Sequence, residues 1–139
     1  GREKYEIPII NEVDKTGPPL DFTYVTTYVP GNNVKLSNNP NLFVCCTCED
    51  NCKDPTRCEC ILQMNGLAYD NDGMLIIDEG KVNGIYECND RCSCHLNRCK
   101  NRIVGNGPNI PLEVYRVSNE KGWGVRCKVD INIGTFIAT

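Results

Sequence analysis

The sequence has little of what usually builds a hydrophobic core. Its 139 residues include one tryptophan, three phenylalanines and two methionines, against twelve glycines and eight prolines. No apolar pattern of helical period extends over a long segment, and no internal repeat or low-complexity tract is present. A chain of this length forms one domain, or one domain and part of another. Because its apolar core would be small, its fold needs a further source of stability besides apolar burial.

Other absences exclude classes of protein. No run of about 18 apolar residues is present, so we expect no membrane span. The net charge is −3, so the chain has no overall basic surface, and we expect no direct nucleic-acid partner. The first residues, GREKYEIPII, contain neither an initiating Met nor the apolar core of a signal peptide. A secreted protein whose signal has been removed stays open at this point.

Cysteine, in contrast, is abundant: the chain has eleven, ten of them in two groups. The stretch VCCTCEDNCKDPTRCEC (44–60) contains six, and ECNDRCSCHLNRCKNR (87–102) contains four. The spacings C-x-C-x3-C-x5-C-x-C and C-x3-C-x-C-x4-C place some thiols two residues apart. Such neighbours bond each other poorly but can face one metal centre, and an odd number of cysteines fits a disulfide framework poorly. We therefore favour metal over disulfides.

The ligand type indicates which metal. Thiolate-only sites select zinc among the common intracellular ions, with iron–sulfur clusters as the redox competitor. Two separate four-cysteine sites would leave one of the nine regularly spaced thiols unused, whereas three zinc ions fit nine thiolates if three of these each bridge two ions. That arrangement has a charge of about −3. The basic residues Arg91, Arg98, Lys100 and Arg102 are placed to offset it, although they also fit an ordinary solvated face.

The order of further motifs is more specific. YECNDRCSC, then NRIV after the last cysteine of the second group, then KGWGVR and GTF, follow an N-terminal segment with NEVD and a Pro-Pro pair. Together they resemble the pre-SET region and first strands of the histone H3 lysine-9 methyltransferases that carry a triangular three-zinc, nine-cysteine cluster. The resemblance covers essentially the whole chain. Cys127 and the C-x4-C ending favour the branch whose SET domain is split by an insertion.

The resemblance implies a set of zinc ligands. They would be Cys46, Cys48, Cys52, Cys58, Cys60, Cys88, Cys92, Cys94 and Cys99. Cys45 stands where the family usually has a small residue, and it competes with Cys46 as the first ligand. We interpret Cys127 as a small buried hydrophobe in a strand and His95 as a surface residue or a neighbour of the site.

The resemblance also implies a cofactor. In SET enzymes the KGWG turn forms part of the S-adenosylmethionine pocket, so Lys121, Gly122 and Trp123 would contact that cofactor. The alternative is an ordinary hairpin turn with a packed tryptophan. The family's Asn-His motif and post-SET cysteines are not found in this sequence, which stops at GTFIAT inside a predicted strand. We expect no catalytic residue here and a segment that is inactive by itself.

The expected fold is small, metal-stabilised, irregular and mainly β, with a triangular zinc–cysteine cluster and the first β-hairpin of a SET domain. Residues 1–44 would be an extended segment leading into pre-SET, 45–102 the zinc cluster with a hairpin spacer at 61–87, and 103–139 the truncated first strands of SET. The spacer would turn at Asn71-Asp72-Gly73 and loop out. We expect strands at 112–117, 123–129 and 134–138, and short strands or extended segments at 5–11 and 21–29.

Two functional hypotheses follow. The first is a structural zinc module of a nuclear, chromatin-associated, gene-silencing methyltransferase that uses S-adenosylmethionine. Its partners would be the remaining SET and post-SET regions of the same protein and the histone H3 tail. The second is a free-standing cysteine-rich module that binds metal or protein and has no methyltransferase attached. The tail with KGWG and GTF distinguishes them, because a storage or toxin-like module has no use for it.

Overall fold

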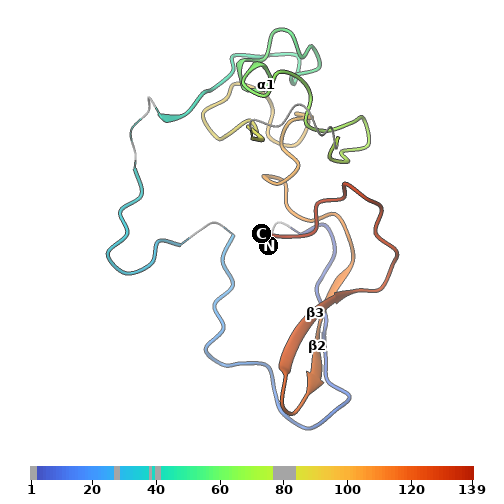
Figure 1. Cartoon of the computed structure of the whole chain (residues 1–139). Helices are drawn as coiled ribbons and strands as arrows, with labels where there is room; N and C mark the ends of the chain where they lie inside the picture. Colours follow the sequence, from blue (N-terminus) through green and yellow to red (C-terminus); the bar gives the residue numbers. More distant parts are fainter. Residues whose placement is uncertain (1–2, 27–28, 38, 40–41, 77–83) are drawn as a thin grey trace. The chain divides into compact units, whose positions relative to one another are not determined.

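Regular secondary structure makes up a small part of the chain. The computed structural model describes residues 3–26, 29–37, 39, 42–76 and 84–139. Within them it has one short helix and three strands, joined by turns and extended segments (Figure 1). The elements are β1 (Ile9–Ile10), α1 (Glu59–Leu62), β2 (Leu112–Ser118) and β3 (Gly122–Cys127). This confirms the expectation of a small, irregular and mainly β fold.

Two compact units make up the structure, each assembled from segments distant in sequence. The first comprises Gly1–Leu36 and Asn109–Ile131 and contains the three strands. The second comprises Ser37–Pro108 and Asn132–Thr139 and contains α1 and both groups of cysteines. We call them the strand unit and the cysteine unit.

The strand unit is a three-stranded sheet in the order β1–β2–β3. β2 and β3 form an antiparallel hairpin in which Leu112 pairs with Cys127 and Val114 with Val125. β1 lies parallel to β2 on its other edge, and the Pro8 carbonyl accepts a hydrogen bond from the Val114 N–H at 2.9 Å. The β-branched and aromatic residues of LEVYRVS and GWGVRC favour strands, as predicted.

Other strand predictions have different outcomes. In 5–11 the strand is only two residues long, because Asn11 then starts a turn in which its Oδ1 accepts hydrogen bonds from the N–H groups of Val13 and Asp14. Of the segment 21–29, predicted to be a short strand or an extended segment, residues 21–26 and 29 form no strand, and 27–28 lie outside the described residues. The strand predicted at 134–138 is also absent. A strand needs a partner backbone along its length, and among the described residues this segment has one bond of that kind, from the Leu75 N–H to the Gly134 carbonyl at 2.8 Å.

The turn of the hairpin lies slightly earlier than predicted. β3 already begins at Gly122, so the turn residues are 119–121, and the Ser118 hydroxyl accepts a hydrogen bond from the Lys121 N–H at 3.0 Å. Gly124 belongs to β3. A Cβ at Gly124 would lie 3.0 Å from Val117 Cγ2, so close packing within the hairpin favours glycine there.

The core of the cysteine unit is made largely of sulfur. Thirteen buried residues form it, and nine of them are cysteines. The other four are Ile61, Met64, Ala68 and Tyr69, which lie on α1 and in the turns after it. The first part of the predicted spacer 61–87 therefore packs on the cysteines and does not loop away from them.

α1 is a single helical turn within this core. The Leu62 N–H donates to the Cys58 carbonyl at 2.9 Å, and the Gln63 N–H donates to the Glu59 carbonyl at 3.2 Å. Four residues carry no periodic apolar signal, which is why the sequence did not predict this turn. In the part of the chain that the structure describes, no helix is long and apolar enough to cross a membrane.

The hairpin predicted within the spacer is present as a tight reversal. Tyr69 and Leu75 form an antiparallel bridge across it. Gly73 has a φ of +82°, and a Cβ at this position would lie 2.9 Å from Ile103 Cδ1. Glycine is therefore favoured by the backbone conformation and by the close approach of Ile103. The continuation of the hairpin at 77–83 lies outside the described residues.

Candidate metal centre

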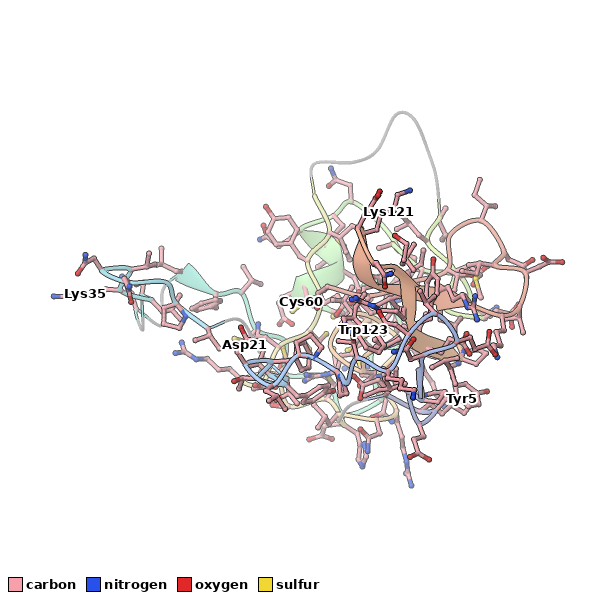
Figure 2. The ribbon with its side chains drawn as sticks, turned by 90° about the horizontal axis from the view of Figure 1, so that it is seen from below. Tyr5, Asp21, Lys35, Cys60, Lys121 and Trp123 are labelled. Carbon is pink, nitrogen blue, oxygen red and sulfur yellow. The ribbon has the colours of Figure 1, made fainter. Side chains whose placement is uncertain are left out.

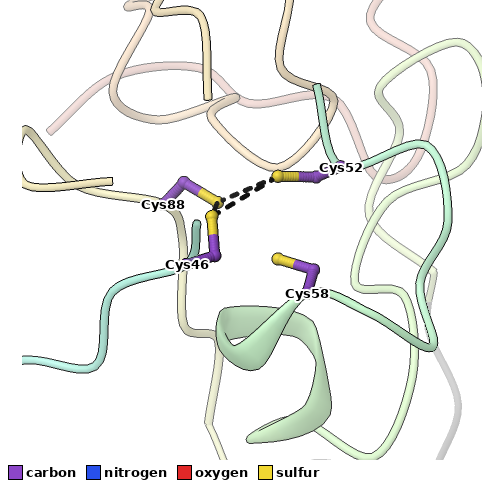
Figure 3. Close-up of side chains that lie close together, drawn as sticks. All are labelled: Cys46, Cys52, Cys58 and Cys88. Atoms are coloured by element: carbon purple, nitrogen blue, oxygen red, sulfur yellow. Dashed lines mark hydrogen bonds between the residues drawn. The ribbon is translucent and has the colours of Figure 1, made fainter. Parts of the chain in front are cut away.

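Both groups of cysteines contribute to one cluster of sulfur atoms. Cys46 and Cys52 come from the first group and Cys88 from the second, and their Sγ atoms lie 3.6–3.7 Å from one another. Cys58, the residue before α1, directs its sulfur toward the same three (Figure 3). Residues as far apart as 42 positions in sequence thus meet at one point.

The spacing of these sulfurs fits metal coordination. Four sulfurs bound tetrahedrally to one Zn²⁺ at about 2.3 Å lie about 3.8 Å from one another. The two sulfurs of a disulfide lie about 2.05 Å apart. The separations of 3.6–3.7 Å agree with the first geometry. All eleven cysteines are free thiols, so the geometry supports metal binding over disulfides.

Three groups of four sulfurs could each hold one metal ion, since the sulfur atoms of each group lie within 4.8 Å of one another. Cys88 belongs to all three groups, and Cys46, Cys52 and Cys94 belong to two each. The groups are Cys46, Cys52, Cys58 and Cys88; Cys46, Cys88, Cys92 and Cys94; and Cys52, Cys88, Cys94 and Cys99. Because they overlap, the sulfurs form one continuous cluster.

The two other predicted ligands, Cys48 and Cys60, lie beside these groups. Cys60 Sγ is 3.7 Å from Cys92 Sγ. Cys48 is buried, and burial, followed by the charge of the nearby Cys58 sulfur, raises its pKa. All nine predicted ligands are therefore gathered in one buried core.

Three residues outside the predicted ligand set also lie outside the four-sulfur groups: Cys45, the alternative first ligand, Cys127 and His95. Cys45 Sγ contacts Asn89 Oδ1 at 3.5 Å, so the geometry favours Cys46 as the first ligand. Cys127 lies half-buried on β3 in the strand unit. His95 is exposed, and its Nδ1 accepts a hydrogen bond from a backbone N–H.

Backbone N–H groups point at the sulfurs. Cys92 Sγ accepts hydrogen bonds from the N–H groups of Cys46 at 3.4 Å and Asn89 at 3.3 Å. Cys99 Sγ accepts one from the Asn101 N–H at 3.4 Å. A thiolate accepts such bonds more strongly than a thiol, because charge on the acceptor strengthens a hydrogen bond. A donor set of buried sulfurs with N–H groups around them fits zinc held by thiolates.

Burial opposes ionisation of several of these thiols. It raises the pKa values of Cys46 and Cys52, and it raises the pKa of Cys60 to about 12. In contrast, a hydrogen bond from the Cys88 thiol lowers the pKa of Cys99 to about 5. Most thiols in this core therefore need a bound cation to ionise, and metal binding would release protons.

An unpredicted turn directs Cys52 into the cluster. Asn51 and Cys52 have positive φ values of 63° and 57°, a conformation that costs a non-glycine residue about 1–2 kcal/mol. Asp50 holds the turn, because its Oδ1 accepts the Cys52 N–H and its Oδ2 accepts the Asp54 N–H, each at 3.0 Å. The Asp-Asn pair in EDNC was the sequence signal for this turn.

Of the basic residues expected to offset the sulfur charge, Arg102 is in contact with a sulfur. Its side chain is buried, with Nη2 at 2.7 Å from the Asn89 carbonyl and 3.5 Å from Cys94 Sγ. Arg91 stacks instead on the Phe43 ring. The exposed Arg98 and Lys100 agree with the alternative of a solvated face.

The residues expected to contact a cofactor lie around the hairpin turn in the strand unit (Figure 2). They are Lys121, Gly122 and Trp123. The Arg116 guanidinium lies 5.7 Å from the centre of the Trp123 ring. Arg116 Nη2 also lies 3.1 Å from Asp14 Oδ2. Arg116 therefore links the NEVD motif to the KGWG motif.

Comparison with known proteins shows which family this chain resembles in sequence. The family model described as the Pre-SET motif matches residues 1–102. The histone-lysine N-methyltransferase eggless of Drosophila pseudoobscura pseudoobscura is 40% identical over 147 residues, which cover 99% of this chain and 12% of that protein. The H3 lysine-9 specific histone-lysine N-methyltransferase of Schizosaccharomyces pombe is 39% identical over 140 residues, which cover 95% of this chain and 28% of that protein.

A solved structure of a related protein has a similar fold. KRYPTONITE in complex with mCHH DNA, an H3(1–15) peptide and SAH has a TM-score of 0.78 and 29% sequence identity, covering 98% of this chain and 28% of that one. This chain thus spans 12–28% of the length of these relatives. The family model covers most of the chain, including both groups of cysteines. The chain therefore belongs to the Pre-SET family, whose members here are regions of histone-lysine methyltransferases.

Proposed function

We propose that the cysteine unit binds three Zn²⁺ ions. The observation that carries the proposal is the gathering of nine cysteines in one buried core, within which three four-sulfur groups overlap. Three four-coordinate ions need twelve zinc–sulfur bonds, and nine thiolates provide them if three bridge. The proposed ligands are Cys46, Cys48, Cys52, Cys58, Cys60, Cys88, Cys92, Cys94 and Cys99.

In this proposal the centre is structural. A catalytic zinc keeps one coordination position open, whereas a structural zinc has four protein ligands. Nine thiolates with three bridging fill every position, so no position is left for substrate. When bound, zinc contributes folding free energy directly. The nine side chains then take over the role that aliphatic residues have in an ordinary core.

We further propose that the longer protein is an S-adenosylmethionine-dependent methyltransferase of the histone H3 lysine-9 class, acting on chromatin in the nucleus. The relatives from Drosophila and Schizosaccharomyces pombe support the activity, and the KRYPTONITE complex with an H3 peptide and SAH supports the substrate and cofactor. The histone H3 tail would be the substrate, and the rest of the SET and post-SET regions would be partners within the same protein.

We propose a separate role for each of three successive segments of the chain. Residues 1–44 would lead into the pre-SET region, 45–102 would hold the zinc with its spacer at 61–87, and 103–139 would begin the SET domain. In the last segment, Lys121, Gly122 and Trp123 would contact the cofactor. The positive φ of Gly122, 75°, supports this, because glycine allows a backbone to approach a ligand closely.

The number of zinc ions tests the proposal. We expect native mass spectrometry of the reduced protein to show three zinc ions per chain. Two ions would contradict the shared cluster and indicate separate four-cysteine sites. A chain that binds no zinc when reduced, and that is lighter by pairs of hydrogens when the reductant is omitted, would indicate disulfides and would reject the proposed centre.

A further inference from the structure

Arg102 is a buried cation without a carboxylate partner in the part of the chain that the structure describes. Arg102 is only 3% exposed to solvent. The ion pairs of the described residues join Arg116 to Asp14, and Arg126 and Lys128 to Glu113. Burying an arginine without a negative partner is strongly unfavourable. The charge that balances Arg102 must therefore be sought among other groups.

Sulfur is the remaining candidate. Arg102 Nη2 lies 3.5 Å from Cys94 Sγ, which belongs to two of the three four-sulfur groups. A thiolate at this position would provide the negative charge that the buried guanidinium otherwise lacks.

Among the described residues, one N–H of the guanidinium has no acceptor. Arg102 Nε is buried and makes no hydrogen bond to them, although the side chain also donates from Nη2 to the Asn89 carbonyl at 2.7 Å. Buried donors without acceptors are rare because they lose their hydration without replacement. A thiolate is a stronger acceptor than a thiol, so ionised sulfurs near Arg102 would offer this donor a partner.

We propose that Arg102 is the internal counter-ion of the zinc–thiolate centre, donating N–H hydrogen bonds to Cys94 and a neighbouring sulfur while offsetting part of the cluster's negative charge. It is a positioning residue, since it acts on the metal through the thiolates. The inference rests on the proposed function, because three Zn²⁺ with nine thiolates have an excess charge of about −3.

Arg98 provides a matched control. It belongs to the same basic stretch and carries the same charge, but it is exposed. Arg102→Met and Arg98→Met change the net charge of the full chain equally. A third variant, Arg102→Lys, keeps a positive charge but loses the planar set of donors of a guanidinium.

The first measurement is zinc affinity by competition with a chromophoric chelator. We expect Arg102→Met to bind zinc about 10–100-fold more weakly, as is typical for groups that hydrogen-bond to metal ligands. Arg98→Met should match the unmodified chain, and Arg102→Lys should lie between the two. Equal affinities for Arg102→Met and Arg98→Met would overturn the inference.

The second measurement separates a contact with the thiolates from a merely structural role. In the cobalt-substituted protein, loss of N–H donors to sulfur should shift the sulfur-to-cobalt charge-transfer band to longer wavelength in both Arg102 variants and not in Arg98→Met. If Arg102→Met does not fold, Arg102→Lys decides: an unshifted band together with unchanged zinc affinity would overturn the inference. An unmodified chain that binds no zinc would instead reject the proposed function.

Discussion

At the scale of single residues, cysteines of this chain lie in different surroundings, as Cys92 and Cys127 show. Cys92 is buried, accepts two backbone N–H hydrogen bonds and lies 3.7 Å from Cys60. Cys127 lies half-buried on β3 and belongs to no four-sulfur group. Two residues of the same type are therefore expected to respond differently to the same substitution.

We expect Cys92→Ser to lose at least one of the three proposed zinc ions and to destabilise the cysteine unit. A serine hydroxyl replaces a thiolate ligand poorly, because zinc in such sites is selective for sulfur. Cys127→Ser should leave the metal content unchanged. Zinc per chain, measured by native mass spectrometry for both variants, checks this; equal losses would contradict the ligand assignment.

Glu87 is a second residue with a specific role. Its Oε1 accepts hydrogen bonds from the Tyr69 hydroxyl at 2.8 Å and the Val104 N–H at 2.7 Å, and its Oε2 accepts the Gly105 N–H at 2.9 Å. One carboxylate thus joins the turns after α1 to the segment that follows Cys99, the last cysteine of the second group. Tyr69 is buried, so its hydroxyl depends on this partner.

We expect Glu87→Ala to lower the free energy of unfolding of the zinc-bound protein by about 1–3 kcal/mol, the usual cost of a buried polar group left without its partner. Urea denaturation at fixed zinc concentration measures the change. Glu49→Ala removes an exposed carboxylate and is the control. A difference below about 0.5 kcal/mol, the usual range for surface substitutions, would show that Glu87 contributes little.

At the scale of elements, the β2–β3 hairpin was predictable and its surroundings were not. Alternating β-branched and aromatic residues mark both strands locally. The parallel pairing of Ile9–Ile10 with β2 joins positions about a hundred residues apart, which no local pattern encodes. The single turn of α1 is too short for a periodic signal, and the strand predicted at 134–138 has apolar residues but too few backbone partners.

The contact between Asp14 and Arg116 gives a prediction for the hairpin. Trp123 is the only tryptophan, so its fluorescence reports on the ring beneath Arg116 without interference. In Asp14→Asn, Arg116 loses the carboxylate that holds it, and we expect the emission of Trp123 to shift to longer wavelength as the ring becomes more hydrated. Asp21→Asn, an exposed position with the same change of charge, should leave the spectrum unchanged.

The same contact has a defined dependence on pH. Hydrogen bonds, chiefly from Asn11 and then from Thr16, lower the pKa of Asp14 from 3.8 to about 2. A depressed carboxyl pKa stabilises the folded state above the ordinary value and loses that effect as the pH falls through the lower one. The fluorescence difference between the unmodified chain and Asp14→Asn should therefore be full above about pH 4, fall to about half near pH 2 and disappear below that. A difference that persists unchanged below pH 2 would contradict this origin.

At the scale of the whole molecule, the cysteine core was predicted from spacing and the packing around it was not. Thiols two residues apart and an odd total pointed to a shared metal centre, and the nine cysteines do form one core. Ile61, Met64, Ala68 and Tyr69 cover that core, but in the sequence they looked like part of a spacer. Their burial depends on cysteines on both sides of them in the sequence, which is a tertiary effect.

Removal of metal should therefore unfold the cysteine unit. Four apolar side chains are too few to form a core without the nine proposed zinc ligands, and zinc binding in small domains contributes on the order of 10–16 kcal/mol to folding. We expect a strong chelator, added under reducing conditions, to make residues 44–76 and 84–108 sensitive to limited proteolysis. Added Zn²⁺ should restore protection and added Mg²⁺ should not. Protection that survives complete removal of zinc would show that the core holds without metal.

The presence of Cys88 in all three four-sulfur groups has a consequence for synthesis of the protein. No such group is complete until Cys88 has been translated, 42 residues after Cys46. At a translation rate of about 5–20 residues per second, roughly 2–8 s pass between the synthesis of Cys46 and that of Cys88. During that interval the earlier thiols are open to oxidation or to capture of a metal ion in an incomplete site. The order of translation therefore sets a period in which the nascent chain depends on a reducing environment.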